Sequence, residues 1–381
     1  MLVADSSVDI AIVGVFREWG GTYRRLLNQI HLWVEWGLTV ELVTFRDGVR
    51  FYPDEVPESV GFVHLGTRGK WASSFALWRY MRRRRPQVVL SVNHISNLVL
   101  AGTWRLPGVA SRRYLSVPNT FGESEKLAQE PRRRAQKFRQ IRRVYPNADG
   151  VIAVSDGVRD DLLDTVGLTG VEVTRIYSGS VSPQALERAR EPLDHPWFAD
   201  DRDRPVIVTV GRLVPQKDYA TLLRAFARVL EERPARLVIV GKGRDLPALE
   251  ALADELGVRE QVDFAGFQAN PYPWMLRADV FALSSRWEGL VNVVMEALGL
   301  GTPVVSTDCP SGPREILADG RYGILVPMQD PEALADGLLT TLRGDGPQYT
   351  TEEAVQPFMA ETAARAYLDH FGLKAPREGR S

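Results

Sequence analysis

The chain has 381 residues, of which 44% are hydrophobic and 25% charged, and this length exceeds what one hydrophobic core usually serves, so two domains are expected. Its 47 Lys and Arg residues against 48 Asp and Glu residues give a net charge of −1, which excludes a protein defined overall by nucleic-acid binding or by an acidic tail. The single cysteine, Cys309, excludes an intramolecular disulfide and favours a reducing, cytoplasmic compartment.

Targeting and membrane-spanning segments are not expected. Residues 1–10 hold two aspartates and no sustained apolar core, unlike a signal peptide. No window approaches the ~20 apolar residues of a spanning helix. The sequence therefore predicts a protein that is not integral to a membrane, although it could lie against one.

Short apolar runs alternate with helix-period stretches along the chain, which predicts βαβ units and parallel sheets. In the first half the expected strands are Asp9–Phe16, Thr39–Phe45, Gly61–Leu65, Val88–Asn93, Arg113–Val117, Gly150–Val154 and Val173–Tyr177. The amphipathic helices between them include Tyr23–Trp36, Phe75–Arg84 and Arg132–Tyr145. In the second half the expected strands are Val206–Val210, Leu237–Val240, Val262–Phe264, Val280–Leu283, Pro303–Thr307 and Gly323–Val326.

A proline-rich and acidic stretch, Ser180–Arg204, separates the halves and is the best linker in the sequence. The pattern predicts two doubly wound α/β domains. The first covers residues 1–185 and the second residues 205–350, with a linker at 186–204 between them. A C-terminal helix and tail follow at 351–381, with the helix over Thr351–Phe371.

In open parallel sheets, ligands bind beyond the carboxyl ends of the strands, so the strand-to-helix junctions are the places to search. The first unusual junction follows Val206–Val210. Gly211 ends the strand, and Arg212 and Lys217 follow on the loop. A guanidinium can clamp a phosphate in a bidentate manner while an ammonium acts as a point charge, so the pair suits a diphosphate. The alternative is that both are solvated loop charges.

A second junction carries two glycines, Gly241 and Gly243, where backbone N–H groups could approach a ligand. A dinucleotide fingerprint would need a third glycine at the position of Leu246, so that fingerprint is absent. The first strand of the chain likewise leads only to Gly14 and then to Gly20 and Gly21. A tight turn is the alternative reading of the Gly241–Gly243 pair.

The third junction is the most informative. Glu288 lies in the loop after a predicted strand, and Glu296 comes eight residues later, about one turn into the next helix. Gly289 and the first N–H groups of that helix lie between the two carboxylates. Carboxylates accept hydrogen bonds from vicinal hydroxyls, so a ligand with a central diphosphate and polyols at both ends fits, as in a nucleotide sugar. The alternative is a capping glutamate beside an unrelated helix glutamate.

These residues carry a family resemblance. The E-x7-E pair Glu288 and Glu296, with Gly211-Arg212 and Lys217 before it and 301–305 (GTPVV) after it, resembles the retaining glycosyltransferases of family four over about Pro205–Gly337. The run Thr307–Leu317 is similar to the branch that builds bacterial surface glycans from UDP-sugars, and the first half is similar more loosely through Gly20-Gly21. The resemblance implies an α/β GT-B fold, with two Rossmann-like domains facing a cleft and a C-terminal helix that crosses back to the first domain.

The resemblance also implies roles. Arg212 and Lys217 would hold the donor diphosphate and stabilise it as a leaving group. Glu296 would accept from the ribose hydroxyls and Glu288 from the transferred sugar. The other donor-binding residues that it implies are Gly20, Gly21, Gly211, Gly241, Gly243, Gly289, Leu290, Asn292 and Val293. The implied reaction is transfer with retention of configuration, without a metal or another cofactor.

Two further sites have open interpretations. His94 comes just past the predicted strand Val88–Asn93; it could hydrogen-bond the transferred sugar, as the resemblance implies, or be an ordinary loop histidine. The run Asp201-Arg202-Asp203 has the D-x-D pattern of metal-dependent transferases, but because it lies in the predicted linker it is interpreted as solvated linker. The segments 176–180 and 117–120 depart from the family pattern, which leaves the acceptor geometry and the hinge open.

The balanced net charge hides an asymmetry. Residues 68–143 contain eighteen basic and three acidic residues. Within them, Arg82–Arg85 and the predicted amphipathic helix Arg132–Arg143 are typical of a surface that docks on anionic lipid. Pairing with acids of the second domain is the alternative, and nucleic acid is disfavoured because stacking aromatics are not interleaved with these arginines.

The sequence therefore predicts a glycosyltransferase that moves a sugar from a nucleotide sugar, UDP-linked by the resemblance, to a lipid-linked or polysaccharide acceptor. It is expected in the cytoplasm, peripheral at the inner face of the cell membrane. The alternatives are a nucleotide-sugar epimerase of the same fold and a non-catalytic protein that binds glycans or lipid head groups.

Overall fold

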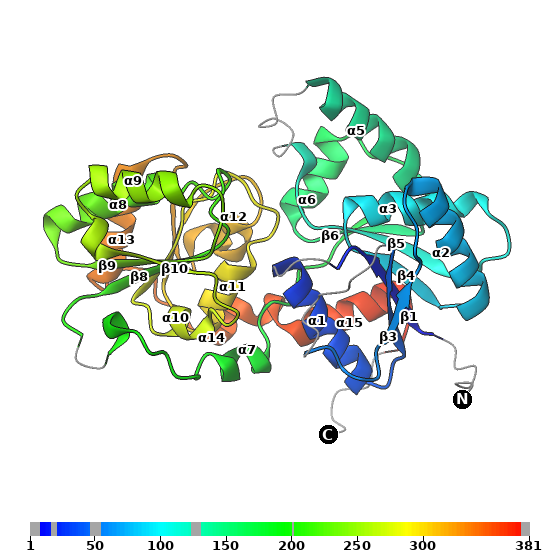
Figure 1. The fold of residues 1–381 in the computed structure, drawn as a ribbon, viewed down its shortest axis with the longest axis horizontal. Helices are drawn as coiled ribbons and strands as arrows, with labels where there is room; N and C mark the ends of the chain where they lie inside the picture. The colour runs from blue at the N-terminus through cyan, green and yellow to red at the C-terminus, as the bar shows by residue number, and fades with distance from the viewer. Residues whose placement is uncertain (1–7, 17–20, 46–54, 123–130, 200–201, 375–381) are drawn as a thin grey trace. The chain divides into compact units, whose positions relative to one another are not determined.

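The computed structural model describes residues 8–16, 21–45, 55–122, 131–199 and 202–374, and the chain divides into two compact units (Figure 1). Unit 1 comprises Met1–Gly179 and Ala360–Ser381, and unit 2 comprises Ser180–Met359. Unit 2 is thus a continuous segment inserted into unit 1.

Unit 1 contains a seven-stranded, wholly parallel sheet in the order β3-β2-β1-β4-β5-β6-β7. The strands are β1 (Ile10–Gly14), β2 (Val40–Thr44), β3 (Gly61–His64), β4 (Val88–Ser91), β5 (Arg112–Val117), β6 (Gly150–Ala153) and β7 (Val173–Arg175). The helices are α1 (Gly21–Glu35), α2 (Lys70–Arg84), α3 (His94–Ala101), α5 (Pro131–Val144), α6 (Asp156–Asp160) and α15 (Ala360–Phe371). Ile10 of β1 lies opposite Val40 on one side and Val88 on the other, so the strand order reverses between β1 and β4.

The C-terminal helix α15 completes the core of unit 1 by packing against α1 (Figure 1). Trp33 of α1 is fully buried, its ring lies 6.0 Å from Tyr367 and 6.4 Å from Phe371, and its Nε1 donates to the Ala364 carbonyl at 3.2 Å. The predicted return of the C-terminal helix to the first domain is confirmed. The predicted single helix Thr351–Phe371 is instead two helices, because the chain leaves helical geometry at Met359, between the units.

Unit 2 contains a six-stranded parallel sheet in the order β10-β9-β8-β11-β12-β13. The strands are β8 (Val206–Val210), β9 (Arg236–Val240), β10 (Val262–Gly266), β11 (Val280–Leu283), β12 (Val304–Thr307) and β13 (Ile324–Val326). The helices are α7 (Pro183–Arg188), α8 (Tyr219–Glu232), α9 (Leu246–Glu255), α10 (Tyr272–Leu276), α11 (Asn292–Gly299), α12 (Pro313–Ile316), α13 (Pro331–Leu342) and α14 (Thr351–Val355). Here the order reverses between β8 and β11.

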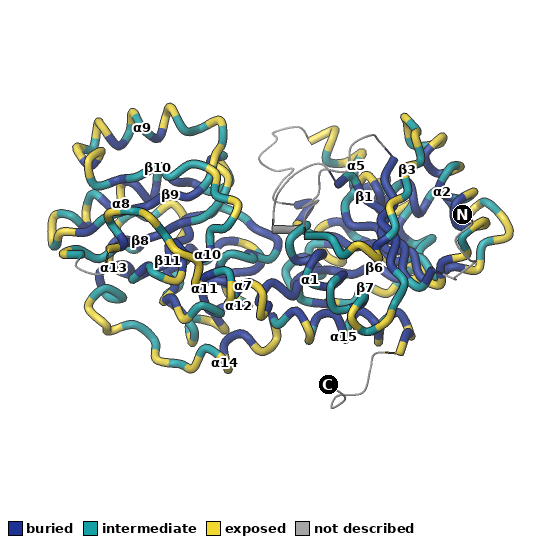
Figure 2. The backbone as a smooth tube through the Cα atoms, turned by 60° about the horizontal axis from the view of Figure 1, so that its bottom comes forward, coloured by how far each residue is buried: buried dark blue, intermediate teal, exposed yellow. Residues whose placement is uncertain are grey.

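The central strands are continuous apolar runs because helices cover both faces of a parallel sheet. Every residue of β1, β4 and β11 is buried, and these strands are drawn in dark blue in Figure 2. The predicted α/β fold of two doubly wound, parallel-sheet units is confirmed. Within the described part of the chain, no helix combines the length and the apolar character needed to cross a membrane.

The described residues of the expected linker, 186–199 and 202–204, lie inside unit 2, and several of them pack there. Arg277 donates to the carbonyls of Ala189 and Glu191 at 3.2 and 3.0 Å, and the His195 ring lies 5.2 Å from the Trp274 ring. The sequence did not reveal these contacts because a proline-rich, acidic stretch has no helical or strand periodicity.

The two ends of unit 2 meet. The Val181 N–H donates to the Phe358 carbonyl at 3.2 Å, and Val181 and Met359 form an isolated parallel bridge. The chain therefore enters and leaves unit 2 at one place.

Candidate active site

The predicted donor residues of unit 2 gather at the carboxyl ends of β8 and β11. These strands are neighbours in the sheet and flank the point where its order reverses. A parallel sheet opens at such a point, since the connections on its two sides run to opposite faces. The loops 211–218 and 284–291 both start there, so the structure brings together residues that are 71 positions apart in sequence.

An ion pair joins the two loops. Lys217 Nζ donates to Glu288 Oε1 at 2.6 Å, and the side chains are only 14% and 9% exposed. The Ser284 hydroxyl donates to the Lys217 carbonyl at 2.7 Å, which ties the backbone of the first loop to the second. The sequence-based prediction paired Lys217 with Arg212 on one ligand and did not anticipate its contact with Glu288.

Two residues that the sequence analysis missed also hold the Glu288 carboxylate. The Ser285 hydroxyl donates to Oε1 at 2.7 Å, and Gln216 Nε2 lies 3.4 Å from Oε2 and donates to the Trp287 carbonyl at 2.8 Å. Ser285 stands three residues before Glu288, a spacing that could have drawn attention to it. Gln216 gave no such signal, because its contact depends on the neighbouring strand.

Glu296 occupies the fifth position of α11 and is 7% exposed. This confirms the expected placement of Glu288 in a loop and Glu296 about one turn into the next helix. Gly289 and Leu290 lie between them, and the half-exposed Asn292 and Val293 form the first positions of α11. The first N–H groups of a helix have no partner within it and carry partial positive charge, so this end of α11 can face an anion.

The loop after β12 is hydrogen-bonded to the Glu288 loop. The Glu288 N–H donates to the Pro310 carbonyl at 3.2 Å, and the Ser311 hydroxyl donates to the Gly289 carbonyl at 2.6 Å. Cys309 lies in the same loop. Burial raises the pKa of its thiol and the nearby Glu288 carboxylate raises it further, so the thiol stays protonated at neutral pH.

Arg212 differs from Lys217. Its side chain is exposed, and it has no ion pair among the residues that the structure describes. A cation held at the sheet edge without a protein partner can reach an anionic ligand at little desolvation cost.

The glycines after β8 and β9 allow their two loops to touch. A Cβ on Gly241 would lie 1.8 Å from the Gly211 carbonyl oxygen, and a Cβ on Gly243 would lie 2.1 Å from the Leu213 carbonyl oxygen. The Leu213 N–H donates to the Lys242 carbonyl at 3.1 Å across this contact. Backbone packing alone therefore requires glycine at both positions, in agreement with the tight-turn alternative for this pair.

His94 belongs to unit 1, where it is the first residue of α3 and not part of a loop. Asn93 caps this helix by accepting from the Ser96 N–H at 3.0 Å. The Nδ1 atom of His94 lies 3.0 Å from the Tyr145 hydroxyl, which also accepts from Asn97. Burial raises the pKa of Tyr145, so its phenol stays protonated at neutral pH.

The other predicted residue of unit 1 that the structure describes is Gly21. Gly21 begins α1, after β1, while Gly20 lies outside the described residues. The structure therefore assigns Gly21 and His94 to one unit and the remaining described donor candidates to the other.

The predicted amphipathic helix α5 buries Phe138 and Ile141 and exposes most of its arginines. Arg132, Arg139 and Arg143 have no ion pair within the described ranges. In the other cluster, Arg84 donates from Nε to Glu41 at 3.1 Å, whereas Arg82, Arg83 and Arg85 are exposed.

The D-x-D run shows no metal-binding arrangement in its described part. Asp203 lies 3.3 Å from Arg204 and 3.7 Å from Arg236, and Asp201 lies outside the described residues. Across the described ranges no group of three or more His, Cys, Asp or Glu side chains could hold a metal ion.

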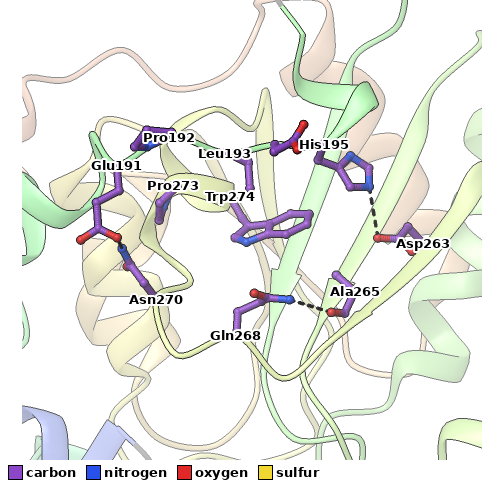
Figure 3. Close-up of a pocket in the computed structure, with 11 residues that line it drawn as sticks. Glu191, Pro192, Leu193, His195, Asp263, Ala265, Gln268, Asn270, Pro273 and Trp274 are labelled. Atoms are coloured by element: carbon purple, nitrogen blue, oxygen red, sulfur yellow. Dashed lines mark hydrogen bonds and ion pairs between the residues drawn. The ribbon is translucent and has the colours of Figure 1, made fainter.

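A hollow of about 510 Å³ lies elsewhere in unit 2 (Figure 3). His195 Nε2 lies 3.4 Å from Asp263 Oδ2, Gln268 donates to the Ala265 carbonyl at 2.8 Å, and Asn270 donates to Glu191 at 2.8 Å. None of the predicted donor residues lines it. The His195, Gln268 and Asn270 side chains of this hollow are thus each paired, where the predicted linker meets β10 and α10.

Comparison with known proteins agrees with the fold and with the division into two units. The profile described as "Glycosyltransferase Family 4" matches residues 19–180, and that described as "Glycosyl transferases group 1" matches residues 204–344. The crystal structure of Anabaena Alr3699/HepE in complex with UDP superposes with a TM-score of 0.74, at 18% identity, over 96% of this chain and 100% of that one. Fold and site thus define a two-unit protein of the GT-B class.

Two curated relatives are similar in sequence. An N-acetylgalactosamine-N,N'-diacetylbacillosaminyl-diphospho-undecaprenol 4-alpha-N-acetylgalactosaminyltransferase of Campylobacter jejuni is 34% identical, over 53% of this chain and 53% of its own length. The lipopolysaccharide core biosynthesis glycosyltransferase LpsE of Rhizobium meliloti is 32% identical, over 60% of this chain and 66% of its own length. The chain thus spans between about half and two thirds of these relatives. The chain belongs to the family 4 glycosyltransferases, and its second unit matches the group 1 profile.

Proposed function

We propose that this protein transfers a sugar from a UDP-linked nucleotide sugar to a lipid-linked or polysaccharide acceptor, with retention of the anomeric configuration. The observation that carries the proposal is the arrangement at the β8–β11 switch point. There two cations, Arg212 and Lys217, lie on the loop beside Glu288, and Glu296 follows in α11. Cations suit a diphosphate and carboxylates suit sugar hydroxyls, so the residues match the parts of a nucleotide sugar.

In this proposal the donor diphosphate binds near Arg212, Lys217 and the first N–H groups of α11, with Gly289 and Leu290 alongside. Glu296 accepts from the ribose hydroxyls, and Glu288 accepts from hydroxyls of the transferred sugar. The bond between the anomeric carbon and the diphosphate oxygen breaks, and the cations stabilise the negative charge that develops on the leaving group. Since these cations supply that charge, we expect no requirement for a divalent metal.

The acceptor hydroxyl then attacks the same face of an oxocarbenium-like centre, and its proton passes to the departing diphosphate. The printed names of the relatives support the acceptor class, since one acts on a diphospho-undecaprenol-linked glycan and another belongs to lipopolysaccharide core synthesis. The arginines of 82–85 and 132–143 would hold the protein at the inner face of the cell membrane, where such acceptors lie. His94 as a contact of the transferred sugar stays a prediction.

A donor screen tests the function without knowledge of the acceptor. UDP-, GDP- and ADP-sugars are each incubated with the protein, with and without a chelator, and sugar release to water is measured. UDP should raise the melting temperature, and Glu296→Ala should remove this protection while the exposed control Glu255→Ala keeps it. Absence of binding to every nucleoside diphosphate contradicts the proposal, and conversion of a UDP-sugar to its epimer would favour an epimerase.

A further inference from the structure

The outer face of α2 carries aromatic rings that the fold leaves in water. Trp71 is 73% exposed and Phe75 is 51% exposed, and the partly buried Trp78 follows at the next helical turn. Positions i, i+4 and i+7 lie on one side of a helix. The residues that α2 buries lie on the opposite side: Ser73, Ser74, Leu77, Tyr80 and Met81.

A neighbouring turn extends this face. Trp104, 44% exposed, lies in the 3-10 turn Gly102–Arg105, which packs beside α2. Trp78 Nε1 donates to the Pro107 carbonyl at 2.9 Å, and this bond holds the segment just after the turn against the helix. Trp71, Phe75, Trp78 and Trp104 are called the aromatic surface below.

Cations are interleaved with these rings. The Arg82 guanidinium lies 5.2 Å from the Trp78 ring centre, Arg105 lies 5.4 Å from Trp104, and Lys70 Nζ lies 5.6 Å from Trp71. The sequence holds no Asp or Glu between Ser59 and Gly122. The exposed arginines 79, 82, 83, 85 and 105 therefore have no nearby acid in the sequence, and none has an ion pair within the described ranges.

We propose that the aromatic surface and its arginines dock unit 1 onto an anionic phospholipid bilayer. Tryptophan and phenylalanine gain by leaving water for the head-group region, where the indole N–H can still find a partner. Arginines beside them can bury their aliphatic stems and direct their guanidinium groups to lipid phosphates. The docking itself does not depend on the proposed function. Its biological role does, since docking would bring unit 1 to a lipid-linked acceptor.

The same residue types could bind single-stranded nucleic acid. The expectation that aromatics do not alternate with arginines holds for α5, whose Phe138 is buried, but it is wrong for α2. Proteins that bind single strands usually place the aromatics in a groove that follows the backbone. The outer side of a helix is convex, a shape that suits a planar bilayer better than a strand.

Vesicle sedimentation tests the proposal. The full chain is mixed with phosphatidylglycerol–phosphatidylcholine vesicles or with pure phosphatidylcholine vesicles. We expect binding to the mixed vesicles that weakens with salt. Trp71→Ala with Phe75→Ala should lower the partition coefficient roughly tenfold or more, since two rings no longer leave water. Arg82→Gln with Arg83→Gln should lower it about fivefold per charge at low salt.

Matched variants separate this surface from general effects. Leu163→Ser alters an exposed apolar residue of unit 1, and Arg224→Ala alters an exposed arginine of unit 2; both should bind vesicles like the unaltered protein. The proposal is overturned if the unaltered protein ignores anionic vesicles, or if the α2 variants bind them equally well. It is also overturned if an oligonucleotide binds through Trp71 and Phe75 while vesicles do not.

Donor chemistry is measured on the same preparations without vesicles. Trp71→Ala/Phe75→Ala should keep UDP protection and sugar release, which also shows that the variant is folded. If the unaltered protein hydrolyses the donor but does not bind anionic vesicles, only the docking proposal is contradicted. If the unaltered protein binds vesicles but binds no nucleotide, only the proposed function is contradicted.

Discussion

Lys217 and Glu288 hold each other where the loops after β8 and β11 meet, with Nζ and Oε1 2.6 Å apart and with little exposure of either side chain. The two residues come from loops after neighbouring strands, so the pair also fixes the spacing of those loops. In the proposed reaction the donor diphosphate would share the Lys217 ammonium with this carboxylate.

Removal of the lysine should therefore cost stability. Lys217→Met leaves the Glu288 carboxylate buried, with Ser285 and Gln216 as its remaining side-chain donors in the described part of the chain, and we expect the free energy of unfolding to fall by about 3 kcal/mol. Adding Glu288→Gln should recover a large part of that loss, because no buried charge remains unpaired. Urea unfolding measures both. Strictly additive losses in the double variant would show that the pair is not coupled.

Arg212 should behave in the opposite way. Because the side chain is exposed and without an ion pair in the described structure, Arg212→Ala should change the free energy of unfolding by less than about 0.5 kcal/mol. Sugar release should fall on the order of 10²-fold if the guanidinium stabilises the leaving diphosphate. Arg212→Lys should restore only part of the rate, since an ammonium lacks the bidentate fork. Arg224→Ala is the matched control, and unchanged turnover in Arg212→Ala would contradict the proposed role.

The contact between the β8 and β9 loops predicts a glycine effect. In Gly243→Ala the new methyl would lie 2.1 Å from the Leu213 carbonyl oxygen, so the two loops must separate, at a cost of roughly 1–3 kcal/mol or more. Affinity for UDP should fall as well, because the Gly211–Lys217 loop moves. Gly346→Ala, whose methyl would meet Thr341 at 3.8 Å, is the control. Equal melting temperatures for the two variants would be inconsistent with this contact.

We expect His370 to make unit 1 sensitive to acid. It lies on α15, with its ring 5.0 Å from Tyr114, and its buried Nε2 has no hydrogen-bond partner among the residues that the structure describes. Burial lowers its pKa from the usual 6.5, although Glu172 opposes this shift. The unfolded chain therefore binds the proton more readily, and stability falls as pH drops through the unfolded value near 6.5.

The histidine can be tested by substitution. His370→Leu should flatten the dependence of unit 1 stability on pH between 7 and 5. Hydrogen exchange of the α1 and α15 amides measures that stability. An unchanged slope would assign the acid sensitivity to other groups.

Local sequence patterns were sufficient to predict where the strands lie in the chain. Val206–Val210 and Val280–Leu283 are continuous apolar runs, and they form β8 and β11 with the predicted bounds. Motif order placed Arg212, Lys217 and Glu288 at the ends of these strands. Their meeting at one switch point follows from the strand order, which requires the whole sheet.

What the sequence did not reveal depends on contacts between distant segments. Gln216 reaches Glu288 only because β8 and β11 are neighbours, and the 186–204 segment is held by Arg277 and Trp274 from α10 and its C-cap. The face of α2 was missed for another reason. Trp71 and Phe75 have the spacing of a buried stripe, and only the fold shows that they point to solvent.

The insertion of unit 2 into unit 1 has a consequence for synthesis of the chain. Unit 2 has all its segments once residue 359 has emerged from the ribosome, whereas unit 1 still lacks α15, which covers Trp33. Domains usually complete from the N-terminus onward. Here the second unit in the sequence can finish folding first. Trp33 of the first unit stays uncovered until Tyr367 and Phe371 have been synthesised and can pack on it.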